Sequence, residues 1–157
     1  MWKVYTGSLL LLAAAPAAAT DATSNMSVTA TVVTACTINT PDTLAFGTAI
    51  TNTDSEITAQ ANIPVICSNT GSYKVFLGNG SNYAASTRRM ASGSNYLSYA
   101  VYMDAGRATE FPTSAASAVA LAGTAAVVNT IVYGTIPVQT TPPPGAYVDT
   151  MQITVRY

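Results

Sequence analysis

The carboxylates are the side chains of this sequence that could supply acid–base chemistry. Asp54 and Glu56 lie in a Thr- and Asn-rich stretch, and Asp104 is followed by Ala-Gly, which is typical of a turn after a strand. Glu110 is the fourth candidate. Hydrolysis of a glycosidic bond needs two carboxylates that face each other across a cleft. Nothing in the spacing predicts such a pair, so we expect that the protein is not an enzyme.

Arginine and tyrosine side chains are the remaining candidates for ligand binding. Arg88-Arg89 could hold an anion or a glycan, although a solvated loop accounts for the pair more simply. The nine tyrosines could form a sugar-binding face, but most fall at strand positions where packing explains them. Only 8% of residues are charged and the net charge is -1, against about 25% charged residues in ordinary soluble domains. This composition excludes nucleic-acid binding through a basic face.

Residues 1–19 have the pattern of a secretory signal peptide. Lys3 lies in a short leading segment, the stretch 9–15 is apolar, and Ala17 and Ala19 are small residues before the expected cleavage site. The apolar stretch is too short to cross roughly 30 Å of hydrocarbon as a helix. We therefore expect an exported chain of residues 20–157 that forms a single domain, with no membrane segment after cleavage.

Two cysteines and no histidine limit the remaining chemistry. Without histidine, neither a Ser-His-Asp nor a Cys-His site can form, and no metal can have a histidine ligand. In an exported protein, an even pair such as Cys36 and Cys67 usually forms a disulfide. A reactive thiol is the alternative, but the neighbouring residues would not stabilise a thiolate. We expect a disulfide, with no metal and no cofactor.

Alternation with a period of two, together with many β-branched residues and tyrosines, predicts strands rather than helices. The expected strands are 26–32, 57–66, 72–77, 96–103, 130–136 and 147–157. Pro64 predicts a break or an edge in the second of them. Segment 111–128 remains open, because its Ala-rich run could form a helical turn whereas Gly123 and the flanking Thr and Val favour a loop and a strand.

Several short strands separated by Gly, Pro and Asn predict an all-β, immunoglobulin-like sandwich. The final strand places Met151, Ile153, Val155 and Tyr157 on one face and continues to the last residue. A sandwich of this type usually needs one further strand. We therefore expect an incomplete sandwich that exposes apolar core and unpaired backbone groups, which is an aggregation hazard unless another strand covers them.

The amino end of the exported chain has the pattern of a complementary strand. Met26, Val28, Ala30 and Val32 alternate with polar residues, so they could fill a groove left by the missing strand of a neighbouring copy. An ordinary first strand in the chain's own sheet fits the same alternation equally well. The pattern alone leaves both possibilities open.

A series of short stretches, in order along the exported chain, resembles one known family. The stretches are 28–38 (VTATVVTACTI), 44–48 (LAFGT), 63–80 (IPVICSNTGSYKVFLGNG), 88–90 (RRM), 96–107 (YLSYAVYMDAGR), 132–137 (VYGTIP) and 143–157 (PPGAYVDTMQITVRY). Their order and spacing resemble the spore coat protein U domain family, which includes archaic, Csu-type chaperone–usher pilins. The chain departs from the family at Phe111-Pro112, where relatives often carry Trp-Gly.

The resemblance implies an incomplete immunoglobulin-like β-sandwich that lacks its last strand and is completed by donor-strand exchange. A periplasmic chaperone lends such a subunit a strand, and an outer-membrane usher replaces it with the amino-terminal segment of the next subunit. Carried onto this sequence, the donor strand lies within 20–32, and its groove-facing residues are Met26, Val28, Ala30 and Val32. The last strand would border the acceptor groove with Tyr147, Met151, Ile153, Val155 and Tyr157. A Cys36–Cys67 disulfide would tie the first two strands together.

The function implied by the resemblance is that of a structural subunit in a secreted surface fibre used for adhesion and biofilm formation. The implied partners are neighbouring copies or related pilin subunits, a periplasmic chaperone and an outer-membrane usher, and the destination is the cell surface. Tip subunits of such fibres carry an additional adhesive domain, so a single domain predicts a shaft or adaptor subunit. The alternatives are a single-domain adhesive or glycan-binding module and a spore-coat structural protein.

Overall fold

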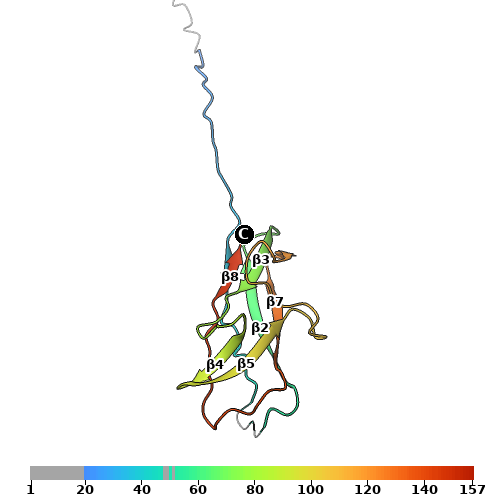
Figure 1. Ribbon diagram of the computed structural model, residues 1–157. Helices are drawn as coiled ribbons and strands as arrows, with labels where there is room; N and C mark the ends of the chain where they lie inside the picture. The colour runs from blue at the N-terminus through green and yellow to red at the C-terminus, as the bar shows by residue number, and fades with distance from the viewer. Residues whose placement is uncertain (1–19, 48–49, 51) are drawn as a thin grey trace, which may run out of the picture. The chain divides into compact units, whose positions relative to one another are not determined.

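The structure, a computed structural model, describes residues 20–47, 50 and 52–157, so the expected signal peptide lies outside the described residues. The described part contains strands and no helix (Figure 1). The strands are β1 (Cys36–Ile38), β2 (Ile57–Cys67), β3 (Ser72–Leu77), β4 (Arg88–Ser92), β5 (Asn95–Tyr102), β6 (Ala120–Ala122), β7 (Val127–Ile136) and β8 (Ile153–Arg156).

Residues 32–157 form a compact unit of two antiparallel sheets. One sheet has the order β1-β2-β7-β5-β4, and the other has the order β6-β3-β8. Apolar side chains from both sheets meet in one core, including Val65 and Val132 from the larger sheet and Val75 and Leu77 from the smaller one. Burying this apolar surface from two sheets is the main stabilisation of a sandwich. The expected all-β, immunoglobulin-like fold is confirmed.

Residues 20–31 form a separate unit. The strand expected over 26–32 is not formed, and the side chains of Met26, Val28 and Val32 are exposed. A strand is stable only when its backbone groups pair with a neighbouring strand. The alternation of this segment therefore indicates a surface that is suited to pairing but unpaired in the described chain.

Pro64 lies inside β2 and does not break it, so of the two expected alternatives, a break or an edge, the break is wrong. β2 is continuous and central, and Pro64 lies opposite Asn129 of β7. The carbonyl of Pro64 accepts a hydrogen bond from the Asn39 backbone N–H at 2.9 Å, just beyond the last residue of β1. In an antiparallel ladder the N–H and C=O of one residue face the same neighbour. The missing N–H of Pro64 therefore faces the place where β1 has already ended.

The last strand is shorter than the alternation predicts. β8 covers only Ile153–Arg156, although the predicted strand began at Tyr147. Before β8, the backbone of Val148 pairs with Ala91 of β4 through hydrogen bonds of 2.9 and 3.0 Å, so it does not extend the pairing of β8 with β3. Alternation predicts which side chains share a face, but it does not predict with which neighbouring strand each backbone group forms hydrogen bonds.

The loop that departs from the family pattern joins the two sheets. Phe111 is 2% exposed, and its N–H donates to the carbonyl of Val101 in β5 at 2.9 Å. The carbonyl of Pro112 accepts from the N–H of Leu77 in β3 at 2.9 Å. Segment 111–128 then continues through a loop into β6, so no helix forms there and the loop-and-strand alternative is correct.

Candidate functional site

One edge of the smaller sheet is free. β8 pairs with β3, and before β8 the carbonyls of Thr150 and Gln152 accept hydrogen bonds from Ser81 and Gly78 at 3.1 and 2.8 Å. Because backbone groups alternate between neighbours along an antiparallel strand, those of Met151 and Ile153 face the opposite side. No strand of the described residues covers that side. The edge of β8 can therefore accept another strand.

An apolar groove lies beside this edge. It has a volume of about 360 Å³ and is bounded by segment 41–46, which follows β1, and segment 147–153, which leads into β8. Its floor is formed by core side chains from both sheets, namely Ala61, Ile63, Leu77, Tyr99 and Val132. The hydrophobic core of the sandwich thus opens to the surface along the free edge. We call this cavity the groove.

A second cavity of about 720 Å³ adjoins the groove. The two share wall residues, among them Leu44, Phe46 and Tyr147. The second cavity extends to the turn 141–145, where the hydroxyl of Tyr147 donates to the carbonyl of Pro143 at 2.7 Å. The wall formed by Phe46 packs onto the floor, since its ring lies 6.2 Å from that of Tyr99.

The residues predicted to border the groove divide into two groups. Tyr147, Met151 and Ile153 line it. Val155 packs against the core further along β8, and Tyr157 is 60% exposed and outside the lining. Because β8 begins at Ile153, the groove is bordered mainly by the segment that leads into the strand.

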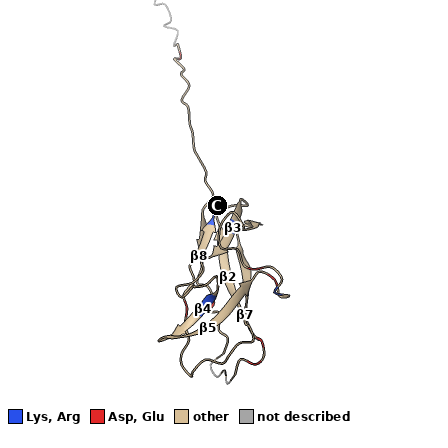
Figure 2. Cartoon of the chain, viewed as in Figure 1, with Lys and Arg blue, Asp and Glu red and all other residues tan. Residues whose placement is uncertain are grey.

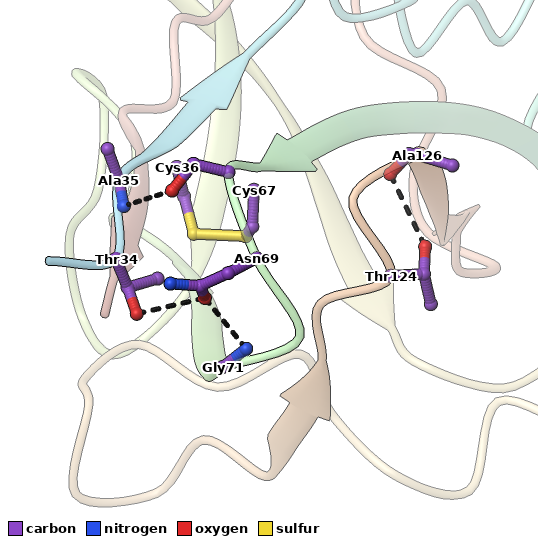
Figure 3. The surroundings of a disulfide bond; sticks show 9 residues. Thr34, Ala35, Cys36, Cys67, Asn69, Gly71, Thr124 and Ala126 are labelled. Carbon is purple, nitrogen blue, oxygen red and sulfur yellow. Dashed lines mark hydrogen bonds between the residues drawn. A yellow bond between two sulfur atoms is a disulfide. The ribbon is translucent and has the colours of Figure 1, made fainter. Parts of the chain in front are cut away.

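The cysteines form the expected disulfide, and no free cysteine occurs among the described residues. Cys36 and Cys67 are register partners at the ends of β1 and β2 (Figure 3). Next to the disulfide, the side-chain oxygen of Asn69 accepts hydrogen bonds from the Thr34 hydroxyl at 3.0 Å and from the Gly71 N–H at 2.9 Å. The disulfide therefore fastens the short edge strand β1, which leads to the groove-wall segment 41–46, to the strand β2.

Asp149 is a groove-lining residue that the sequence pattern did not single out. Its two oxygens accept hydrogen bonds from the Tyr99 hydroxyl at 2.6 Å and from the backbone and side-chain nitrogens of Asn82, each at 3.1 Å. Burial, and then the neighbouring Asp149 carboxylate, raise the pKa of Tyr99 well above 10.0. The phenol therefore stays protonated and remains the donor.

The two adjacent arginines lie in β4, so their interpretation as a solvated loop is wrong. Arg88 is 8% exposed and donates to the Gly78 carbonyl at 3.4 Å. Arg89 donates to the Asn82 carbonyl at 3.0 Å, and its guanidinium lies 4.1 Å from the centre of the Tyr96 ring. Both side chains are thus engaged with other parts of the sandwich.

Two of the four candidate acidic residues, Glu56 and Asp104, have structural partners. Glu56 accepts a hydrogen bond from the Thr135 hydroxyl and forms an ion pair with Arg107 at 2.9 Å. Asp104 accepts hydrogen bonds from the backbone N–H groups of Ala108 and Thr109, and these bonds lower the pKa of its carboxyl. Asp104 therefore closes the turn after β5, as predicted.

Charge is sparse over the sandwich, and most of it carries neither basic nor acidic side chains (Figure 2). In the described part of the chain, no three Cys, Asp or Glu residues gather as metal ligands. None of the described residues form a helix that is long and apolar enough to cross a bilayer.

The fold and the groove define a class of protein, the immunoglobulin-like sandwich that is open along the edge of its last strand. Residues 22–154 match the family described as Spore Coat Protein U domain. The chain therefore belongs to the Spore Coat Protein U domain family.

Two known proteins illustrate the relationship. Protein U of Myxococcus xanthus is 32% identical over 168 aligned residues, which cover 97% of this chain and 94% of that protein. The crystal structure of the CsuC-CsuE chaperone-tip adhesion subunit pre-assembly complex, from archaic chaperone-usher Csu pili of Acinetobacter baumannii, is also similar, with a TM-score of 0.60 and 26% identity. The match covers 81% of this chain but only 40% of that solved chain.

Proposed function

We propose that this protein is a structural subunit of a secreted surface fibre that polymerises by donor-strand exchange. The observation that carries the proposal is the groove, because this apolar cavity reaches core side chains of both sheets beside the free edge of β8. An open apolar cavity beside an unpaired edge is unfavourable for a solitary domain. A strand added from another molecule would bury the apolar surface and pair the edge at once.

The donor in this proposal is the segment 20–32 of a neighbouring copy or a related subunit. Met26, Val28, Ala30 and Val32 would face the groove, whose floor is apolar. Burial of each larger apolar side chain contributes roughly 1.5–3 kcal/mol. The exposure of Met26, Val28 and Val32 supports this role, since these side chains have nothing to bury against in the described chain.

The route to the surface follows from the same proposal. Residues 1–19 would direct export to the periplasm, where a chaperone would fill the groove with a strand of its own until an outer-membrane usher replaces that strand and adds the subunit to the fibre. The similarity to a subunit described in a chaperone complex supports the chaperone as a partner. With its own donor segment, the chain would serve as a shaft or adaptor subunit in adhesion and biofilm formation. Catalysis has no place in this role.

A spore-coat structural protein is the second candidate. It is favoured by the family description and by the match to Protein U over 97% of the chain. Electron microscopy with a labelled antibody separates the two functions. Label along thin surface fibres supports the fibre subunit, whereas label confined to a spore coat supports the second candidate.

The test of polymerisation compares the exported chain with and without residues 20–32 on a denaturing gel, loaded unboiled and boiled. We expect a ladder of oligomers only in the unboiled sample that retains the segment, because a completed sandwich dissociates slowly. A stable monomer in every lane would mean that the domain does not exchange strands, and the proposal would be wrong.

A further inference from the structure

The Asp149 carboxylate connects one wall of the groove, segment 147–153, to two other parts of the sandwich. Here, the wall means segment 147–153. Its hydrogen bonds reach the Tyr99 hydroxyl in β5 and both nitrogens of Asn82 in the loop after β3. Asp149 itself belongs to the segment that leads into β8 and lines the groove. One side chain therefore fixes the spacing between the wall and the floor residue Tyr99.

The loop after β3 is shaped to receive this carboxylate. Gly80 has a φ of +94°, in the region that favours glycine, and a Cβ atom on it would overlap a carboxylate oxygen of Asp149. The N–H of the next residue, Ser81, donates to the carbonyl of Thr150 at 3.1 Å. The backbone of the loop thus approaches the wall as closely as a glycine allows.

The wall is held on the other side as well. Val148 and Ala91 exchange two backbone hydrogen bonds, of 2.9 and 3.0 Å, which join the wall to the edge strand β4. Segment 148–150 is thereby fixed through Val148, Asp149 and Thr150, although it lies outside any strand.

A fixed wall matters because the apolar groove favours collapse. Tyr147 and Met151 lie on either side of the fixed segment, and the floor below them includes Leu77 and Tyr99. A loose wall could bury these side chains against the floor and close the groove, driven by removal of apolar surface from water. A donor strand would then have to reopen the groove, and a required conformational change slows association.

We propose that Asp149 is a positioning residue that holds the groove open before the donor strand arrives. The proposal rests on the proposed function, because it concerns capture of a donor by the same groove. Its expected signature is kinetic. Loss of Asp149 slows association of the donor, whereas dissociation changes little, because a bound donor itself pairs with the edge of β8 and holds the wall.

The experiment uses the full exported chain with Val28→Asp, which disables its own donor strand, and a fluorescent peptide of residues 20–33 as the probe. Asp149→Ala should lower the association rate about tenfold, the change expected for loss of a hydrogen bond to a charged group. The dissociation rate should stay within about twofold. Asp149→Asn should restore part of the rate, because its side-chain oxygen can still accept from Asn82. Asp54→Ala is the matched control, since it removes a carboxylate at an exposed position outside the groove lining, and it should bind like the reference chain.

Tyr99→Phe provides a second variant, which removes only the hydroxyl that reaches Asp149. It should also slow association of the peptide, and it tests the positioning role of Asp149 if the Asp149→Ala chain does not fold. Unchanged association in Tyr99→Phe and Asp149→Ala would overturn the positioning role, as would faster dissociation at an unchanged association rate. A reference chain that never captures the peptide would instead overturn the proposed function, and the positioning role with it.

Discussion

Leu44 packs directly onto Gly134, so that a Cβ atom added to this glycine would lie 2.8 Å from a methyl carbon of Leu44 and equally close to the Phe46 ring. Gly134 lies in β7, and both of its neighbours belong to the groove wall. The absence of a side chain at this position lets the wall lie against the sheet.

Gly134→Ala should therefore displace segment 41–46, which forms one wall of the groove. We expect a loss of about 1–3 kcal/mol in the free energy of unfolding, typical of overpacking, which outweighs the roughly 0.5–1 kcal/mol that alanine gains over glycine in a strand. Chemical denaturation measures the change. Gly78→Ala is the matched control, because its added Cβ would meet only ordinary contacts at 3.6 Å. Equal stability of the two variants would contradict the close packing.

The disulfide should stabilise the domain by restricting the unfolded chain. Cys36 and Cys67 are separated by 31 residues, and removal of a native disulfide from a small exported domain costs about 2–5 kcal/mol. Thermal unfolding of the native chain should shift to lower temperature on addition of a reductant, whereas a Cys36→Ser, Cys67→Ser variant should not respond. An identical melting temperature with and without reductant would count against a stabilising role.

The two faces of the donor segment should differ in their tolerance of charge. Val28→Asp places a charge where the proposal buries an apolar side chain, so oligomers should disappear from unboiled gels while the domain keeps its fold. Thr29→Asp introduces the same charge at the next residue, on the opposite face, and should leave the ladder intact. Loss of the ladder in both variants, or in neither, would refute the assignment of the groove-facing residues.

The apolar lining of the groove should also not tolerate a charged side chain. Met151→Asp places a charge in the groove lining and should prevent the chain from accepting a donor, while Gln152→Asp, at an exposed neighbouring position, should not. A chain with Met151→Asp can still donate, and a chain with Val28→Asp can still accept. Mixing the two should therefore give dimers and nothing longer in size-exclusion chromatography. Longer oligomers, or no dimer, would disagree with exchange through this groove.

Asp104 should give the domain a pH-dependent contribution to stability. The backbone N–H groups of Ala108 and Thr109 lower the pKa of its carboxyl below the ordinary 3.8, so the folded state binds this proton less readily than the unfolded state. The contribution is present above pH 3.8 and is lost as the pH falls through the lower value of the folded state. The melting temperatures of the native chain and of Asp104→Asn should thus converge on acidification. A difference that stays constant to about pH 2 would contradict this.

Much of the fold follows from local patterns along the chain. Strands such as β3 and β5 bury alternate residues, and Leu77, Tyr99 and Val101 lie on the faces that alternation assigns to the core. Period-two alternation is a property of residues that are close in sequence, so it can be recognised without knowing which strands pair. The disulfide was likewise predictable, because the sequence contains only two cysteines.

The sequence by itself determined the all-β class and the core faces of the main strands. Only the tertiary structure decided the path of the backbone at Pro64, the burial of Arg88 and the place of Asp149 beside Tyr99. These features depend on backbone and side-chain partners that are distant along the chain. The packing of the two sheets determines these contacts, and no local sequence pattern predicts them.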